Sequence, residues 1–154
     1  MEWNEIGTVD ELFSIKSRKK YRLSCDIDCK NRKITKILGD FSGVIDGNGH
    51  CIKNLIILED ELWTDTQPIA LFYTMSQSII KNIVLSNLRI EIPKSVYKPS
   101  VAALCVDASD TVFENISVEA SVNYSEILPL VYESNNCKYE NIRLSKNMIE
   151  TKYE

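Results

Sequence analysis

The chain has 154 residues and a net charge of -4, with 44% hydrophobic and 26% charged residues. This length allows one domain with a core of its own, and the composition is ordinary for a globular protein. Residues 1–53 hold ten Lys/Arg and eight Asp/Glu, which gives +2, whereas residues 54–154 hold eight and fourteen, which gives -6. The acidic C-terminal part argues against direct nucleic-acid binding, which needs cations, and fits a basic protein partner.

The sequence has no recognisable export or membrane segment. The start at 1–5 lacks a basic, apolar leader, and no apolar run approaches the roughly 20 residues of a membrane span. The five cysteines are an odd number, and Cys25, Cys29 and Cys105 stand among apolar residues, which indicates reduced thiols. We therefore expect a cytoplasmic protein without membrane contact. An excised fragment of a surface protein would have the same start and would be extracellular.

The N-terminal part predicts a short helix followed by a strand. Thr8 and Glu11 have the spacing of a capping box, in which the two residues satisfy free N–H groups of the first helical turn. The apolar residues that follow share one helical face, so a helix is predicted over 8–17. Apolar and polar residues alternate over 21–27, which predicts a strand with Cys25 on its buried face. Another short extended piece is expected at 34–38.

Three later segments share one template. Leu71, Leu104 and Leu130 are each followed eleven residues later by an Asn, and a fourth copy has Gly43 in the Leu position. A fixed core spacing with variable connections is the signature of a solenoid, here over 42–144. The Asn side chains would form a structural ladder, because each amide can bond the copies above and below it. The four ladder residues are Asn54, Asn82, Asn115 and Asn141.

Residues 41–55 read F-S-G-V-I-D-G-N-G-H-C-I-K-N-L. This resembles the segment F-x-G-x-x-D-G-N-G-H-x-I-x-N-L that precedes the repeats of GLUG-type proteins of bacteria, which are mostly extracellular. The resemblance covers roughly residues 5–145 and implies a right-handed parallel β-helix with an N-terminal helical cap. The Gly-Leu of the family is replaced here by Ala70-Leu71, Ala103-Leu104 and Pro129-Leu130. The family fixes no catalytic residues, and it implies a structural or adhesive module.

We therefore predict an all-β fold for 1–154 as a single domain. It would be a small right-handed parallel β-helix, a solenoid of about four coils, with the short capping helix at its N-terminus. The tail over 145–154 has no strong helix cap, and an open coil end exposes unpaired strand edges. Either this tail covers the end or two chains meet there, and we expect a homodimer through the C-terminal coil.

Residues with metal or catalytic chemistry are few. Cys25, Cys29, His50 and Cys51 are zinc-ligand types, but adjacent His-Cys after C-x3-C is not a usual zinc spacing, so core cysteines and a turn histidine are the preferred interpretation. The D-G-N-G segment at 46–49 lacks the closing Glu of a calcium loop. With a single His and no recurring acid pair, we expect no enzyme activity, no metal and no cofactor.

The longest connections, 59–68 and 86–100, are where solenoids place binding loops. The first is acidic around Trp63, which would anchor on a basic partner, although a plain solvated loop is equally compatible. Tyr73 and Tyr132 share a repeat position and either join a binding patch or stack on the solenoid. The predicted binding residues are Glu59, Asp60, Glu61, Trp63, Asp65, Tyr97, Glu114 and Glu140.

These features predict a non-enzymatic protein-binding module. The specific function that we predict for this module is that of a cytosolic inhibitor of the anti-defence type, encoded by a phage or mobile element. Its acidic face would block a basic enzyme that handles nucleic acid. The alternative is a structural or adhesive repeat module of a bacterial cell-surface protein. A third, less favoured class is a carbohydrate-active enzyme, for which four short coils offer little groove.

Overall fold

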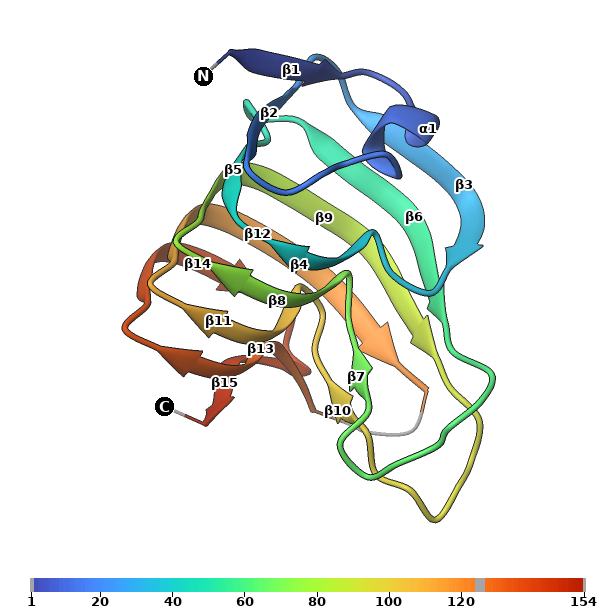
Figure 1. The fold of residues 1–154 in the computed structure, drawn as a ribbon. Coiled ribbons are helices and arrows are strands. Elements are labelled where there is room, and N and C mark those ends of the chain that lie inside the picture. The colour runs from blue at the N-terminus through green and yellow to red at the C-terminus, as the bar shows by residue number, and fades with distance from the viewer. Residues whose placement is uncertain (1, 124–126, 154) are drawn as a thin grey trace.

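The computed structural model describes residues 2–123 and 127–153, and β-strands dominate this part of the chain. Fifteen strands and one short helix follow one another along these residues (Figure 1). Every strand pairing among them is parallel. No helix in the described ranges is long and apolar enough to cross a membrane. The chain is therefore all-β with parallel sheets.

The largest sheet has eight strands: six in the order β1-β2-β5-β9-β12-β14, together with β6, which pairs with β9, and β3, which pairs with β6. The long strand β9 pairs with β5 through its first part and with β6 through its second part. The strands are β1 (Trp3–Ile6), β2 (Lys19–Leu23), β3 (Ile27–Ile34), β5 (Gly43–Asp46), β6 (Cys51–Leu58), β9 (Ile79–Glu91), β12 (Val112–Val122) and β14 (Lys138–Leu144).

A second sheet has five strands in the order β4-β8-β11-β13-β15, and a third has two, β7 and β10. Figure 1 shows the strands of the five-stranded sheet stacked in chain order from the N-terminal to the C-terminal end of the molecule. The strands are β4 (Leu38–Phe41), β8 (Phe72–Ser76), β11 (Cys105–Ser109), β13 (Leu128–Asn135), β15 (Met148–Tyr153), β7 (Pro68–Ile69) and β10 (Ser100–Val101).

The core lies between the sheets and consists of stacked aliphatic and aromatic side chains. The repeat residues Leu71, Leu104 and Leu130 are at most 4% exposed, as the template predicted for core positions. Phe113 and Tyr139 occupy neighbouring positions on β12 and β14, where their rings stack with centroids 5.0 Å apart. In-register parallel pairing thus places equivalent side chains of successive repeats directly over one another.

The N-terminal helix is shorter than predicted: α1 covers only Val9–Leu12. The Thr8 half of the capping box is present, because the Thr8 hydroxyl accepts from the Glu11 N–H at 3.1 Å. The Glu11 carboxylate reaches one residue before the cap and accepts from the Gly7 N–H at 3.0 Å. The prediction of a helix to residue 17 is wrong. Ile15 turns into the core, and the Lys16 N–H donates to the Tyr21 hydroxyl at 2.8 Å instead of continuing the helix.

The predicted strand over 21–27 is interrupted in the structure. Strand β2 ends at Leu23 and β3 starts at Ile27, with a corner between them. Cys25 lies in this corner and is exposed, with its thiol 3.4 Å from the Gly7 carbonyl oxygen. The predicted burial of Cys25 is therefore wrong, because strand alternation does not continue through a corner. Cys29, on β3, is fully buried.

The glycine-rich turn at 47–50 changes the register of the fourth repeat copy. Four residues separate β5 from β6, whereas only two residues separate their partners on β9, Lys81 and Val84. The turn therefore holds two extra residues. Gly43 itself is level with Ser78, seven residues after Leu71, because Val44 pairs with Ile79. Seven residues less the two extra ones place Asn54 level with Asn87, five residues after Asn82, so the fourth copy is not a register equivalent of the other three.

Two further predicted boundaries differ from the structure. Residues 86–91 were expected in a loop but form the second part of β9, so the actual connection is 92–99. This part is extended because it lies between β6 and β12 and pairs with both. The tail expected at 145–154 contains β15, which pairs with β13 and extends the five-stranded sheet.

Candidate functional site

Asn side chains form two ladders rather than one. In the first, each Nδ2 donates to the residue on its N-terminal side: Asn141 to Asn115 at 2.9 Å, Asn115 to Asn82 at 3.0 Å, and Asn82 to the Asp46 carboxylate at 3.2 Å. All three Asn residues have φ between 53° and 56°. Asn tolerates this left-handed conformation well, so the ladder residues allow the strands to bend at these positions.

The fourth predicted ladder residue, Asn54, belongs to the second ladder. Its Oδ1 accepts from Asn87 Nδ2 at 2.9 Å, and its own Nδ2 donates to Asp28 at 3.0 Å. A further column of left-handed residues was missed by the repeat analysis. It contains Gln77, Asp110 and Asn136, each five residues before a ladder Asn, and the amide of Asn136 donates to Asp110 at 2.6 Å.

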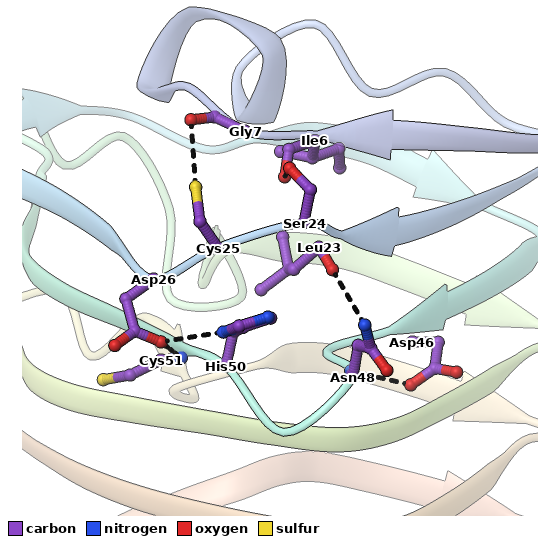
Figure 2. A network of polar contacts seen from close by, with 10 residues as sticks. All are labelled: Ile6, Gly7, Leu23, Ser24, Cys25, Asp26, Asp46, Asn48, His50 and Cys51. Atoms are coloured by element: carbon purple, nitrogen blue, oxygen red, sulfur yellow. Dashed lines mark hydrogen bonds and ion pairs between the residues drawn. The ribbon is translucent and has the colours of Figure 1, made fainter.

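Three of the four zinc-ligand types noted in the sequence, Cys25, His50 and Cys51, lie around the turn at 47–50 (Figure 2), whereas Cys29 is buried in the core. One carboxylate oxygen of Asp26 accepts from the Cys51 N–H at 3.0 Å and lies 3.1 Å from His50 Nδ1. The Cys51 hydrogen bond, together with the His50 contact, lowers the pKa of Asp26. Within the described ranges, no group of three or more His, Cys, Asp or Glu side chains is placed to hold a metal ion.

The thiol at this turn is not activated. Burial, followed by the charge of Asp26, raises the pKa of Cys51. Figure 2 shows its sulfur pointing away from the His50 ring. A cysteine nucleophile needs the opposite, a lowered pKa and a base within reach. The arrangement of Asp26, His50 and Cys51 therefore holds the turn in place.

The predicted aromatic residues Trp63 and Tyr97 lie on two neighbouring loops, 59–67 and 92–99. The Asp65 carboxylate ties the loops together by accepting from the Lys98 N–H at 3.0 Å. Within the first loop, the Trp63 N–H donates to the Gln67 side chain at 2.7 Å. Trp63 is 69% exposed and Tyr97 40% exposed. Five of the predicted binding residues therefore lie on the first loop, and Tyr97 lies on the neighbouring loop. The five are Glu59, Asp60, Glu61, Trp63 and Asp65.

The other two predicted residues, Glu114 and Glu140, lie on a different surface. They are opposite each other on β12 and β14, and both are exposed. Asp107 and Glu133 form a second exposed pair of opposite carboxylates, on β11 and β13. The two pairs lie on different sheets, and the exposed Asp110 stands in the turn that joins β11 to β12 between them. We call these five residues the acidic face. Neighbouring strands are about 4.8 Å apart, so each pair places two like charges close together.

Asp107 and Glu133 were missed by the sequence analysis, although a signal was present. Each stands three residues after a repeat Leu, at the position that Thr74 occupies in the earlier copy. The three ion pairs found among the described residues lie elsewhere: Arg22–Glu5, Arg32–Asp10 and His50–Asp26. Lys81 on β9 is opposite Glu114 and partly offsets its charge, whereas Asp107 has the uncharged Thr74 opposite it on β8.

A groove of about 310 Å³ runs beside the acidic face, between the β7–β10 sheet and the five-stranded sheet. Tyr73, Val106 and Tyr132 occupy equivalent positions on β8, β11 and β13 along it. Lysine ammonium groups lie over both rings, Lys36 at 5.1 Å from Tyr73 and Lys152 at 5.1 Å from Tyr132. Burial, and then the charge of Glu59, raises the pKa of Tyr73.

The geometry thus offers two surfaces for a partner, the loop pair and the acidic face with its groove. Comparisons with protein-family models, with curated proteins and with solved structures find no match for this chain. The resemblance to GLUG-type repeats stays a prediction.

Proposed function

We propose that this protein is a non-enzymatic protein-binding module whose acidic face contacts a basic partner. The observation that carries the proposal is the stacking of like charges, Asp107 over Glu133 and Glu114 over Glu140. Like charges directly opposite each other on neighbouring strands are destabilising. A cationic surface that covers the acidic face would relieve this repulsion, so binding gains free energy that the isolated protein lacks.

The proposed scaffold is a right-handed parallel β-helix of the kind that GLUG-type repeats imply. Support comes from the uniformly parallel pairing, from the in-register stacking of Leu71, Leu104 and Leu130, and from the columns of left-handed residues at successive bends. A stack of this kind holds the carboxylates of the acidic face at fixed spacing. A rigid array loses little conformational entropy on binding, which favours affinity.

The proposed partner is an enzyme that handles nucleic acid, in the cytoplasm of a bacterium. Such enzymes present Lys and Arg to phosphates, and an acidic protein surface competes for the same cations. The charge of -6 over residues 54–154 fits this role. The protein would then act as an inhibitor, of phage or mobile-element origin, by occupying the partner's substrate surface.

Affinity capture from a bacterial lysate tests the proposal. The test variant neutralises the acidic face with Asp107→Asn, Glu114→Gln, Glu133→Gln and Glu140→Gln. A matched control removes two acids from the loop pair, Asp60→Asn and Glu61→Gln. We expect the parent and the control to retain a basic protein that the test variant loses. The captured protein should also dissociate at 1 M salt, where the screening length falls to about 3 Å. Retention by the test variant, or at 1 M salt, would contradict the proposal.

The loop pair supports the second candidate, a structural or adhesive module of a cell-surface protein. Trp63 is 69% exposed on a loop that hydrogen bonds hold in shape, and such an aromatic residue suits a contact surface. This alternative predicts that Trp63→Ala abolishes the binding of a partner while neutralisation of the acidic face does not. The two candidates therefore give opposite results with the same set of variants.

A further inference from the structure

The groove beside the acidic face has a floor and two different walls. Tyr73, Val106 and Tyr132 form the floor. One wall carries the hydroxyl groups of Thr66 and Ser100 near β7 and β10, and the other carries the carboxylates of Asp107 and Glu133. Below the floor, Val106 and Tyr132 pack in a small apolar cluster with the fully buried Ala70 and Ala102, outside the main core.

The floor is suited to a flat cation. Tyr73 and Tyr132 are two strand spacings apart, roughly 10 Å, with Val106 midway between them. A cation that rests on Val106 would therefore lie about 5 Å from each ring position, within the range of about 6 Å for cation–π attraction. Lys36 and Lys152 already lie over these rings from the N-terminal and C-terminal sides, which shows that both rings accept cations.

The charges around the groove favour one more cation. Four carboxylates lie at or near the groove: Asp107 and Glu133 on the wall, Asp40, which accepts from the groove residue Thr74 at 2.6 Å, and Glu59, whose charge acts on Tyr73. Lys36 and Lys152 offset two of these four negative charges, which leaves a local charge of -2. Asp107 and Glu133 are opposite each other, so the forked N–H donors of a guanidinium can bridge the two carboxylates, which a single ammonium does less well.

From this geometry we propose that the groove binds an arginine side chain of the basic partner, with the guanidinium on Val106 between the two tyrosines and hydrogen-bonded to Asp107 and Glu133. This inference rests on the proposed function, since it specifies how the acidic face recognises its partner. The hydroxyl wall formed by Thr66 and Ser100 would accept or donate hydrogen bonds to the main chain beside that arginine.

The test is a titration of the protein with the blocked peptide acetyl-Gly-Arg-Gly-amide, followed through the NMR signals of the Tyr73 and Tyr132 rings. We expect saturable shifts of both rings, and weaker binding of the corresponding Lys peptide. Asp107→Asn with Glu133→Gln should weaken Arg-peptide binding about tenfold, whereas Glu114→Gln with Glu140→Gln should change it by less than about twofold. Lys36→Gln removes a competing cation and should strengthen binding.

The variant Thr66→Arg tests the groove without altering the sheets, because Thr66 is exposed on the loop before β7. It places a guanidinium at the rim of the groove and should block the peptide. Unchanged binding by Thr66→Arg, or equal losses with both pairs of charge substitutions, would overturn the groove assignment. If the peptide fails to bind while lysate capture still depends on the acidic face, only the assignment of the groove as an arginine site is wrong. If capture fails and the peptide binds, the proposed function is wrong and the groove assignment is upheld.

Discussion

The Asn ladders combine two properties of one residue type, a tolerated left-handed backbone and an amide that both donates and accepts. Asn115 has φ 54°, donates to Asn82 and accepts from Asn141. Asn115 is exposed, so its hydrogen bonds compete with water. The contribution of each bond is then at the low end of the usual 0.5–1.5 kcal/mol range, about 0.5 kcal/mol.

Asn115→Ala should lower the free energy of unfolding by about 2 kcal/mol, because the left-handed backbone adds roughly 1 kcal/mol to the lost hydrogen bonds. Asn115→Gly loses the same bonds without the steric cost of a Cβ. It should therefore be about 1 kcal/mol more stable than Asn115→Ala. Urea unfolding monitored by circular dichroism measures both differences. Equal stability of the two variants would show that the left-handed backbone carries no cost here, and loss of partner capture by a stable variant would contradict a structural role.

Asp28 and Asp26 make the fold sensitive to acid. The amide of Asn54, then the Lys30 N–H, lowers the pKa of Asp28, and the Cys51 N–H, then His50, lowers that of Asp26. A carboxylate with a lower pKa in the folded state stabilises it above the unfolded pKa, about 3.9, and this contribution is lost as pH falls through the folded pKa.

Asp26→Asn combined with Asp28→Asn should therefore flatten the loss of stability between about pH 5 and pH 2. The measurement is the urea midpoint as a function of pH. Asn54→Ala keeps the Asp28 carboxylate but removes its main donor, so it should flatten the same slope to a smaller extent. An acid slope that remains as steep in the double variant as in the parent would contradict this account.

At the scale of the element, the turn at 47–50 accommodates two extra residues beside β9 by close backbone contact. The Gly47 and Gly49 N–H groups donate to the carbonyl oxygens of Lys81 and Asn82 at 2.8 and 2.9 Å. A Cβ on Gly47 would lie 2.4 Å from the Asn82 carbonyl oxygen, whereas Gly49 has open space around it but a φ of +80°. The two glycines are thus needed for different reasons, contact in one case and conformation in the other.

Substitution of the two glycines should separate these reasons. Gly47→Ala forces backbone to move and should cost about 3 kcal/mol of stability, while Gly49→Ala should cost about 1 kcal/mol. Thermal and urea unfolding of the two single variants provides the comparison. Equal costs would indicate that the turn moves away from β9 as a unit, and that its contact with Asn82 is not required.

Prediction from the sequence succeeded for the core positions of the repeated segments and failed at the boundaries of individual strands and of the helix. The spacing from Leu to Asn identified stacked core positions because parallel pairing repeats them in register. The same spacing misplaced Asn54, because Gly43 is not level with the repeat Leu positions: Ile37 is level with Leu71, and Gly43 is level with Ser78. The groove could not be predicted from the sequence either. Its wall depends on β7 and β10, which have two residues each and are too short to show any periodicity.

At the scale of the whole molecule, charge is separated along the stack of strands. Near the N-terminal end, cations have local partners: Arg22 pairs with Glu5, and Lys20 and Arg22 both lie over the Trp3 ring. Towards the C-terminal end, the strands β11 to β14 carry the paired carboxylates of the acidic face. The uneven charge of the sequence therefore becomes a dipolar molecule, which would steer the proposed basic partner towards one end of it.

The strands at this C-terminal end also offer a surface for the homodimer that the sequence predicts. Among the described residues, β14 pairs only with β12 and β15 only with β13, so both strands are edges that present unpaired backbone groups. Half-buried apolar side chains lie beside them on the open end, among them Ile142 and Leu144. A second copy placed end to end would cover both the edges and these side chains.

Ile149→Lys tests this arrangement, since Ile149 lies on the edge strand β15 and is 41% exposed. A charge there would be buried without a partner in an end-to-end dimer, so the dimer should dissociate, whereas a monomer tolerates it. Ile79→Lys is the matched control, because Ile79 is 39% exposed but lies on β9, between other strands. Sedimentation velocity should show dimers for the parent and for Ile79→Lys and monomers for Ile149→Lys. A parent that sediments as a monomer at every concentration would refute the contact, and both edges would then be available to a different partner.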